Sequence, residues 1–150
     1  MLATSVHAYA SNIDDLTPIL PVVERICHKH ASLSITPEMY NVVGTYLIEA
    51  ITEVLKGVGI SFEGPLKEAW VRGYWYLAYL FIDREAQLYK SAGWLGWKPF
   101  KVVKRVKESE DITSFYLKPE DGSQLNPYKP GLYISVQLIV DELGYKQSRQ

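Results

Sequence analysis

The chain has 150 residues, of which 47% are hydrophobic and 22% are charged, with a formal net charge of -1 at pH 7. This composition is typical of globular proteins, and the near-neutral charge without a basic run argues against a nucleic-acid partner. A single cysteine, Cys27, excludes a disulfide framework and a cysteine-rich metal site, so we expect a reducing, cytoplasmic location. No apolar run approaches the ~20 residues that span a bilayer, so we expect no transmembrane segment.

The first predicted helix runs from Met1 to about Ile13. Its apolar residues recur at spacings of four, three and four, as one helix face requires: Leu2, Val6, Tyr9 and Ile13. No capping residue or polar turn precedes Leu2. The chain is therefore expected to begin within a helix.

A second helix is predicted to open near Pro18 and Pro21, because a first turn needs no backbone donor there, and to end at His30. One face of it is apolar apart from its last member: Val23, Ile26, Cys27 and His30. His28 falls on the opposite, polar face. An inward imidazole is either a hydrogen-bonded core histidine or a ligand, and since buried polar groups are usually hydrogen-bonded, the pattern alone favours the core histidine.

Two longer helices follow. Thr36-Pro37-Glu38 combines an N-cap hydroxyl, a proline and an acid in the first turn, which predicts a helix over residues 37–55. The next helix is predicted over residues 65–90. Glu85 falls on its apolar stripe, four residues after Phe81, although glutamate is rarely buried without a partner.

Around residues 91–97 the hydrophobic period changes from that of a helix to that of a strand. Strands are predicted over residues 100–106 and 112–117, and the longest strand over Leu132 to Val140. A turn is predicted at residues 141–144, and the chain stops at Arg149-Gln150.

Helices separated in this way from strands predict an α+β fold or two separate domains, with a boundary between residues 94 and 95. The strand part is short and buries little by itself, because small domains have a high ratio of surface to volume. Both parts are therefore expected to be incomplete.

Three polar side chains are predicted to point inward from consecutive helices: His30, Tyr40 and Glu85. A histidine that binds a metal through one ring nitrogen usually donates its other N–H to a carboxylate, which a tyrosine can hold in place. Alternatively, Tyr40 is a core aromatic with its hydroxyl satisfied locally, and Glu85 bends to solvent. The three residues together predict a candidate proximal histidine of a haem.

Several segments in the same order resemble one family, the flavohaemoglobins in their fungal or eukaryotic microbial form. The resemblance extends over the whole chain and rests on these segments: Ala8-Tyr9-Ala10-Ser11-Asn12-Ile13, Lys29-His30, Thr36-Pro37-Glu38-Met39-Tyr40-Asn41-Val42-Val43-Gly44, Phe81-Ile82-Asp83-Arg84-Glu85-Ala86, Gly96-Trp97-Lys98-Pro99-Phe100 and Tyr128-Lys129-Pro130-Gly131-Leu132-Tyr133. It implies that residues 1–94 are the last part of an all-α globin domain. It also implies that residues 95–150 are the first antiparallel strands of a ferredoxin-reductase-type FAD-binding β-barrel.

The resemblance implies roles for five residues around haem b. His30 would bind the iron, and Tyr40 and Glu85 would be its catalytic charge-relay partners. Lys29 would lie near a haem propionate, and Leu2 would lie over the distal face.

Three further residues would contact FAD. Tyr133 matches a flavin-contacting tyrosine of the family. Arg149 and Gln150 match the start of its Arg-x-Tyr-Ser motif, in which the forked, permanently charged arginine meets the flavin phosphate.

The reaction that the resemblance implies is nitric oxide dioxygenation by a monomer, with O2 and NO as small-molecule partners. NAD(P)H would reduce FAD, FAD would reduce the haem, and haem-bound O2 would oxidise NO to nitrate. The early globin helices with the distal tyrosine and glutamine, the Tyr-Ser half of the flavin motif and the nicotinamide site have no counterpart in the sequence. The chain is therefore expected to be an internal fragment, and the alternatives are a non-enzymatic haem or O2-binding globin module and an inactive fragment.

Overall fold

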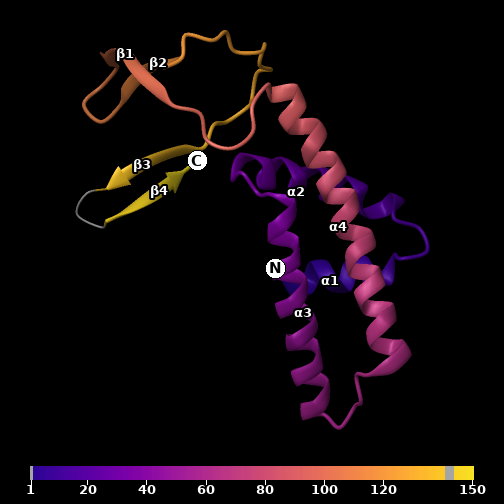
Figure 1. The fold of residues 1–150 in the computed structure, drawn as a ribbon. Coiled ribbons are helices and arrows are strands. Elements are labelled where there is room, and N and C mark those ends of the chain that lie inside the picture. The colour runs from indigo at the N-terminus through magenta and orange to yellow at the C-terminus, as the bar shows by residue number, and fades with distance from the viewer. Residues whose placement is uncertain (1, 141–143) are drawn as a thin grey trace. The chain divides into compact units, whose positions relative to one another are not determined.

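A computed structural model describes residues 2–140 and 144–150, with side chains from residue 4 onward. The helical elements come first: α1 (Leu2–Ser11), the short 3-10 helix η1 (Thr17–Ile19), α2 (Leu20–Ser32), α3 (Pro37–Gly57) and α4 (Gly64–Ala92). Four strands follow: β1 (Phe100–Lys107), β2 (Thr113–Pro119), β3 (Val136–Val140) and β4 (Tyr145–Arg149) (Figure 1). This order confirms the predicted α+β fold.

The chain divides into two compact units. A helical unit comprises Met1–Ala31 and Ile35–Leu88, and a strand unit comprises Ser32–Ser34 and Tyr89–Gln150. The domain boundary expected between residues 94 and 95 stays a prediction. No helix among the described residues combines the length and apolar content needed to cross a bilayer.

In the helical unit, α3 and α4 are joined by a short turn and lie alongside each other in opposite directions (Figure 1). Helix α3 begins at the predicted position, with Thr36 in extended backbone at the N-cap, proline in the first turn and Glu38 near the positive end of the helix dipole, but the Thr36 hydroxyl makes no capping hydrogen bond. Helix α1 is attached to α4 by the Tyr9 hydroxyl, which donates to the Gly73 carbonyl at 2.8 Å. The Tyr9 face of α1 is therefore the face that meets the rest of the unit.

The core of the helical unit draws one or two residues from each of α2, α3 and α4. Its buried members are Cys27, Tyr40, Ala78 and Phe81. Burying such side chains contributes on the order of 1.5–3 kcal/mol for each large apolar group. The core therefore lies where the three helices that carry His30, Tyr40 and Glu85 meet.

The strand unit contains two separate antiparallel pairs. Strands β1 and β2 pair from Phe100↔Pro119 to Lys107↔Thr113, with an irregularity between Val102 and Lys104. Strands β3 and β4 pair from Val136↔Arg149 to Val140↔Tyr145. Among the described residues no third strand joins either pair.

The prediction of a longest strand over Leu132 to Val140 is wrong. Strand β3 covers only Val136–Val140, and β1 is longer, with 8 residues. A strand needs a partner for its backbone hydrogen bonds, and β4 provides one for only 5 residues. Strand β4 itself is not anticipated by the sequence pattern. Of the predicted turn at residues 141–144, only Gly144 lies within the described residues.

Candidate functional site

Three helices bring His30, Tyr40 and Glu85 into direct contact. The imidazole Nδ1 of His30 lies 2.8 Å from Glu85 Oε1 and 3.0 Å from the Tyr40 hydroxyl oxygen. The Tyr40 hydroxyl donates to the same Glu85 oxygen at 2.7 Å. His30 lies in the last turn of α2, and Tyr40 lies in the first turn of α3. Residues 10 and 55 positions from His30 in sequence thus meet at one ring nitrogen.

This geometry determines which nitrogen of His30 carries hydrogen. The Tyr40 hydroxyl uses its only hydrogen on Glu85, so its oxygen can only accept from the imidazole. The carboxylate of Glu85 is likewise an acceptor. Nδ1 therefore donates, and the neutral ring keeps its lone pair on Nε2.

Burial increases from the imidazole to the carboxylate. The His30 side chain is 32% exposed, whereas the Glu85 side chain is 3% exposed. The Phe81 ring lies beneath the imidazole, with ring centroids 5.5 Å apart. Hydrogen bonds to a buried carboxylate are strong because water does not compete for it. The site is therefore anchored in the core and opens at the imidazole.

The surroundings keep two nearby groups protonated, the Tyr40 hydroxyl and the Cys27 thiol. Burial, the hydrogen bond to Glu85 and the charge of that carboxylate all raise the pKa of Tyr40. Burial, followed by the charges of Glu85 and Glu24, raises the pKa of the Cys27 thiol to about 11. Cys27 is fully buried and is thus a neutral core residue rather than a reactive thiolate.

Tyr74 and Gly44 support Tyr40, and the sequence pattern did not single them out. The Tyr74 hydroxyl donates to the backbone carbonyl of Tyr40. A Cβ atom at position 44 would lie 2.5 Å from Cε1 of Tyr74, so only glycine leaves room for this ring. Glycine in the middle of a helix is unfavourable by about 1 kcal/mol, and this was the signal available in the sequence.

Glu24 and Arg84 form a two-point ion pair between α2 and α4. Arg84 Nε lies 2.7 Å from one carboxylate oxygen of Glu24, and Nη2 lies 2.6 Å from the other. The hydrogen bonds from Arg84 lower the pKa of Glu24 to about 2, with a further contribution from His28. The sequence holds no signal for this pair, because charged residues on a polar helix face usually contact only water.

The remaining predicted haem contacts are less defined. Lys29 is exposed on α2, next to His30. Leu2 begins α1, but its side chain lies outside the described residues. Exposed His7 and His28 take no part in the site, and His28 instead contacts Glu24 at 3.1 Å.

The predicted flavin contacts lie on and beside the β3–β4 pair. Tyr133 precedes β3 and is 54% exposed. Arg149 ends β4 and donates to the Ser148 carbonyl at 3.1 Å, and the Gln150 amide donates to Ser135 at 2.9 Å. The structure therefore provides individual candidates for flavin contact rather than an assembled site.

The donor set at His30 is one that would suit a histidine ligand of a haem iron. Nδ1 is occupied by Glu85, and Nε2 of the neutral ring would offer the lone pair that a metal needs. A metal held by protein ligands alone fits less well, because the described residues contain no group of three or more His, Cys, Asp or Glu that could bind an ion. The observed arrangement thus fits the ligand that the resemblance implies.

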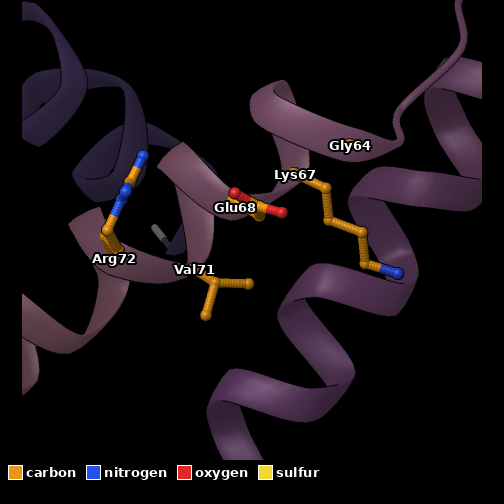
Figure 2. A pocket seen from close by; sticks show the side chains of 5 residues that line it. All are labelled: Gly64, Lys67, Glu68, Val71 and Arg72. Carbon is orange, nitrogen blue, oxygen red and sulfur yellow. The ribbon is translucent and has the colours of Figure 1, made fainter.

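A surface hollow elsewhere in the helical unit contains none of the predicted site residues. It lies at the start of α4 and is lined by Gly64, Lys67, Glu68, Val71 and Arg72. Figure 2 shows that Lys67 and Arg72 extend to opposite sides rather than toward a common point. The charged groups do not converge, so the side chains around this hollow do not form a binding site.

Comparison with known proteins places these features in a family. The globin family model matches residues 2–78. Flavohemoproteins from Bordetella parapertussis and Oceanobacillus iheyensis are 49% and 44% identical to this chain, over 99% of its length. The chain spans 38% and 37% of the length of these two relatives.

A solved structure shows the same relationship. The flavohemoglobin of Malassezia yamatoensis, determined with bound FAD and heme, matches 99% of this chain and 38% of its own, with a TM-score of 0.79 and 32% identity. These findings confirm the resemblance to flavohaemoglobins and the order of a globin part followed by antiparallel strands. The similarity extends to bacterial as well as fungal proteins, so it does not single out the eukaryotic type.

Proposed function

This chain belongs to the globin family, and on that premise we propose that it serves a flavohaemoglobin-type nitric oxide dioxygenase, in which His30 is the proximal haem ligand. The observation that carries the proposal is the buried Tyr40–Glu85 pair on Nδ1 of His30. In this proposal NO is oxidised to nitrate by O2, with electrons from NAD(P)H passing through FAD. A monomer in the cytoplasm, with O2 and NO as partners, completes the proposal.

The residues of the chain contribute by orienting and polarising one imidazole. Glu85 accepts the Nδ1 hydrogen and so increases electron density at Nε2. Tyr40 donates to the same oxygen and prevents the carboxylate from rotating away. Haem, when bound, supplies the redox iron at which O2 and NO react. A more electron-rich proximal ligand favours this reaction, which transfers electron density toward oxygen.

Flavin binding is the less supported half of the proposal. Tyr133, Arg149 and Gln150 are proposed to contact FAD because they match the family's motif positions. The forked guanidinium of Arg149 suits a phosphate. It is exposed in the strand pair and is therefore accessible to a ligand.

A haem or O2-binding globin module without reductase chemistry is the second candidate. The observation that favours it is the contrast between the buried His30 site and the exposed flavin candidates. Quenching of flavin fluorescence on addition of FAD to the chain separates the two. Saturable quenching that is lost in Arg149→Ala supports the dioxygenase, and no quenching supports the module.

Reconstitution of the purified chain with haem tests the proximal ligand. We expect a Soret band that is lost in His30→Gly and is restored when free imidazole fills the vacated space. His7→Gly is the control, because this histidine is exposed on α1 and takes no part in the site. A band that persists unchanged in His30→Gly, or that disappears equally in His7→Gly, would contradict the assignment.

The role of Glu85 requires a second measurement. We expect Glu85→Gln to retain haem but to lower the iron–histidine stretching frequency, because an amide is a weaker acceptor than a carboxylate. Nitrate formed when the pre-reduced, haem-loaded chain is mixed with O2 and NO should fall in the same variant. An unchanged frequency together with unchanged nitrate would refute the relay role.

A further inference from the structure

We propose that Glu24 and Arg84 are positioning residues for the His30–Glu85 pair, because their ion pair sets how α2 lies against α4. The proposal deepens the proposed function and rests on it, since it concerns the orientation of the proposed haem ligand. It assigns a role to two charged residues that contact neither the imidazole nor Tyr40 in the described hydrogen bonds.

The ion pair fixes an orientation and not only a distance. Nε and Nη2 of Arg84 each meet a different oxygen of Glu24, at 2.7 and 2.6 Å. Such a fork allows one relative orientation of the two planar groups, whereas a single contact allows rotation about its axis. A two-point pair therefore restrains the rotation of α2 as well as its separation from α4.

The ion pair and the functional hydrogen bond connect the same two helices. Arg84 directly precedes Glu85 on α4, and Glu24 lies six residues before His30 on α2. Six helical residues span about 9 Å along the axis. Two attachments at this separation, with the fully buried Cys27 between them in sequence, determine both the angle and the register of α2.

The arginine is itself held in place. Its Nη1 donates to the Gln87 side chain at 3.0 Å, and the Gln87 amide donates to Asp83 at 2.9 Å. On the other helix, His28 contacts Glu24 at 3.1 Å. Both ends of the ion pair are thus oriented by neighbours on their own helices, so the constraint reaches both helix backbones.

The imidazole depends on such a constraint because it is only partly enclosed. The His30 side chain is 32% exposed, and its Nδ1–Glu85 distance is 2.8 Å. Sliding or rotation of α2 by about 1 Å would take this bond out of hydrogen-bonding range. Loss of the ion pair should therefore weaken the His30–Glu85 bond without removing either residue.

A double-mutant cycle tests the proposal in the full chain, with Glu24→Gln, Arg84→Met and the double variant. In the haem-free chain, nuclear magnetic resonance measures the exchange of the His30 Nδ1 hydrogen with water. In the haem-loaded, reduced chain, resonance Raman spectroscopy measures the iron–histidine stretching frequency. We expect faster exchange and a lower frequency in each single variant, and no further change in the double variant.

Two controls separate positioning from general destabilisation. Glu49→Gln removes an exposed glutamate of α3 and should leave both readouts at wild-type values. Arg84→Lys keeps the charge but not the fork, so it should give values between those of wild type and Arg84→Met. It also takes the place of Arg84→Met if that variant does not fold. Helical content from circular dichroism identifies the variants that are folded.

Each outcome decides the proposal. Wild-type readouts in folded Glu24→Gln and Arg84→Lys would overturn it, and so would single effects that add in the double variant. If the wild-type chain binds no haem, the proposed function fails. The exchange measurement in the haem-free chain then still decides whether the ion pair positions His30.

Discussion

The helical unit and the strand unit differ in how deeply they bury their candidate functional residues. Glu85 and Tyr40 are 2% and 7% exposed in the helical unit, whereas Tyr133 is 54% exposed in the strand unit. Helices satisfy their backbone hydrogen bonds internally, so a few of them can bury a polar site between their side chains. Two-stranded pairs leave both faces open and are marginal in water. The haem-ligand candidate is therefore built within its unit, and the flavin candidates are not.

The largest expected effect is in the helical unit and follows from Glu85→Ala. The substitution leaves the Tyr40 hydroxyl hydrogen without its buried acceptor and the His30 Nδ1 hydrogen with the Tyr40 oxygen alone, which should lower the free energy of unfolding by about 2 to 4 kcal/mol. Urea denaturation followed by circular dichroism measures it. Glu49→Ala, at an exposed site on α3, is the control and should change little. Equal losses in the two variants would show that the buried pair contributes nothing special.

A smaller loss is expected from Gly44→Ala. The added Cβ would lie 2.5 Å from the Tyr74 ring, so the ring must move and its bond to the Tyr40 carbonyl is strained. The cost of overpacking, about 1–3 kcal/mol, exceeds the gain in helix propensity of about 1 kcal/mol. Gly57→Ala on the same helix meets nothing within 4 Å and should be neutral or stabilising. Urea midpoints of the two variants give the answer, and equal midpoints would contradict the close approach.

The ion pair between α2 and α4 predicts a modest dependence on pH. The folded-state pKa of Glu24 is lowered to about 2 from its ordinary 4.5, so the pair stabilises the fold above pH 4.5 and loses this effect as pH falls toward 2. Because the Glu24 side chain is 43% exposed, the contribution should be below about 1 kcal/mol after screening. The difference in unfolding free energy between wild type and Glu24→Gln should be constant at neutral pH and shrink in acid. A difference that grows in acid would reverse the sign and contradict the assignment.

The smallest effect is expected in the strand unit, from Ile139→Thr on β3. This side chain is 69% exposed, and substitutions at such positions usually change stability by less than about 0.5 kcal/mol. Thermal denaturation of the chain should be nearly unchanged. A loss as large as that of Gly44→Ala would mean that the open face of β3 is covered in solution, and the contrast between the two units would then be wrong.

The local sequence pattern was sufficient to predict the inward residues of the helical site. It was insufficient to predict the residues that hold them in place. Helical spacing placed His30 and Glu85 on apolar faces, because that period follows from hydrogen bonds within one helix. Helical spacing does not predict the residues that support the site. Arg84 contacts Glu24, which is 60 residues away in sequence, and Tyr74 contacts Tyr40, which is 34 residues away. No local period encodes such contacts. For the same reason the predicted extent of β3 was wrong, because a strand ends where its hydrogen-bonding partner ends.

The sequence by itself determined the order of helices and strands, the inward face of each site helix and the resemblance to flavohaemoglobins. These features depend on hydrogen bonds and spacings between near neighbours in the chain. Only the tertiary structure decided that Tyr40 and Glu85 meet at Nδ1 of His30, which leaves the lone pair of the neutral ring on Nε2. It also decided that Glu24 and Arg84 join the two helices involved. Such contacts form between residues far apart in sequence, and they depend on how the helices pack.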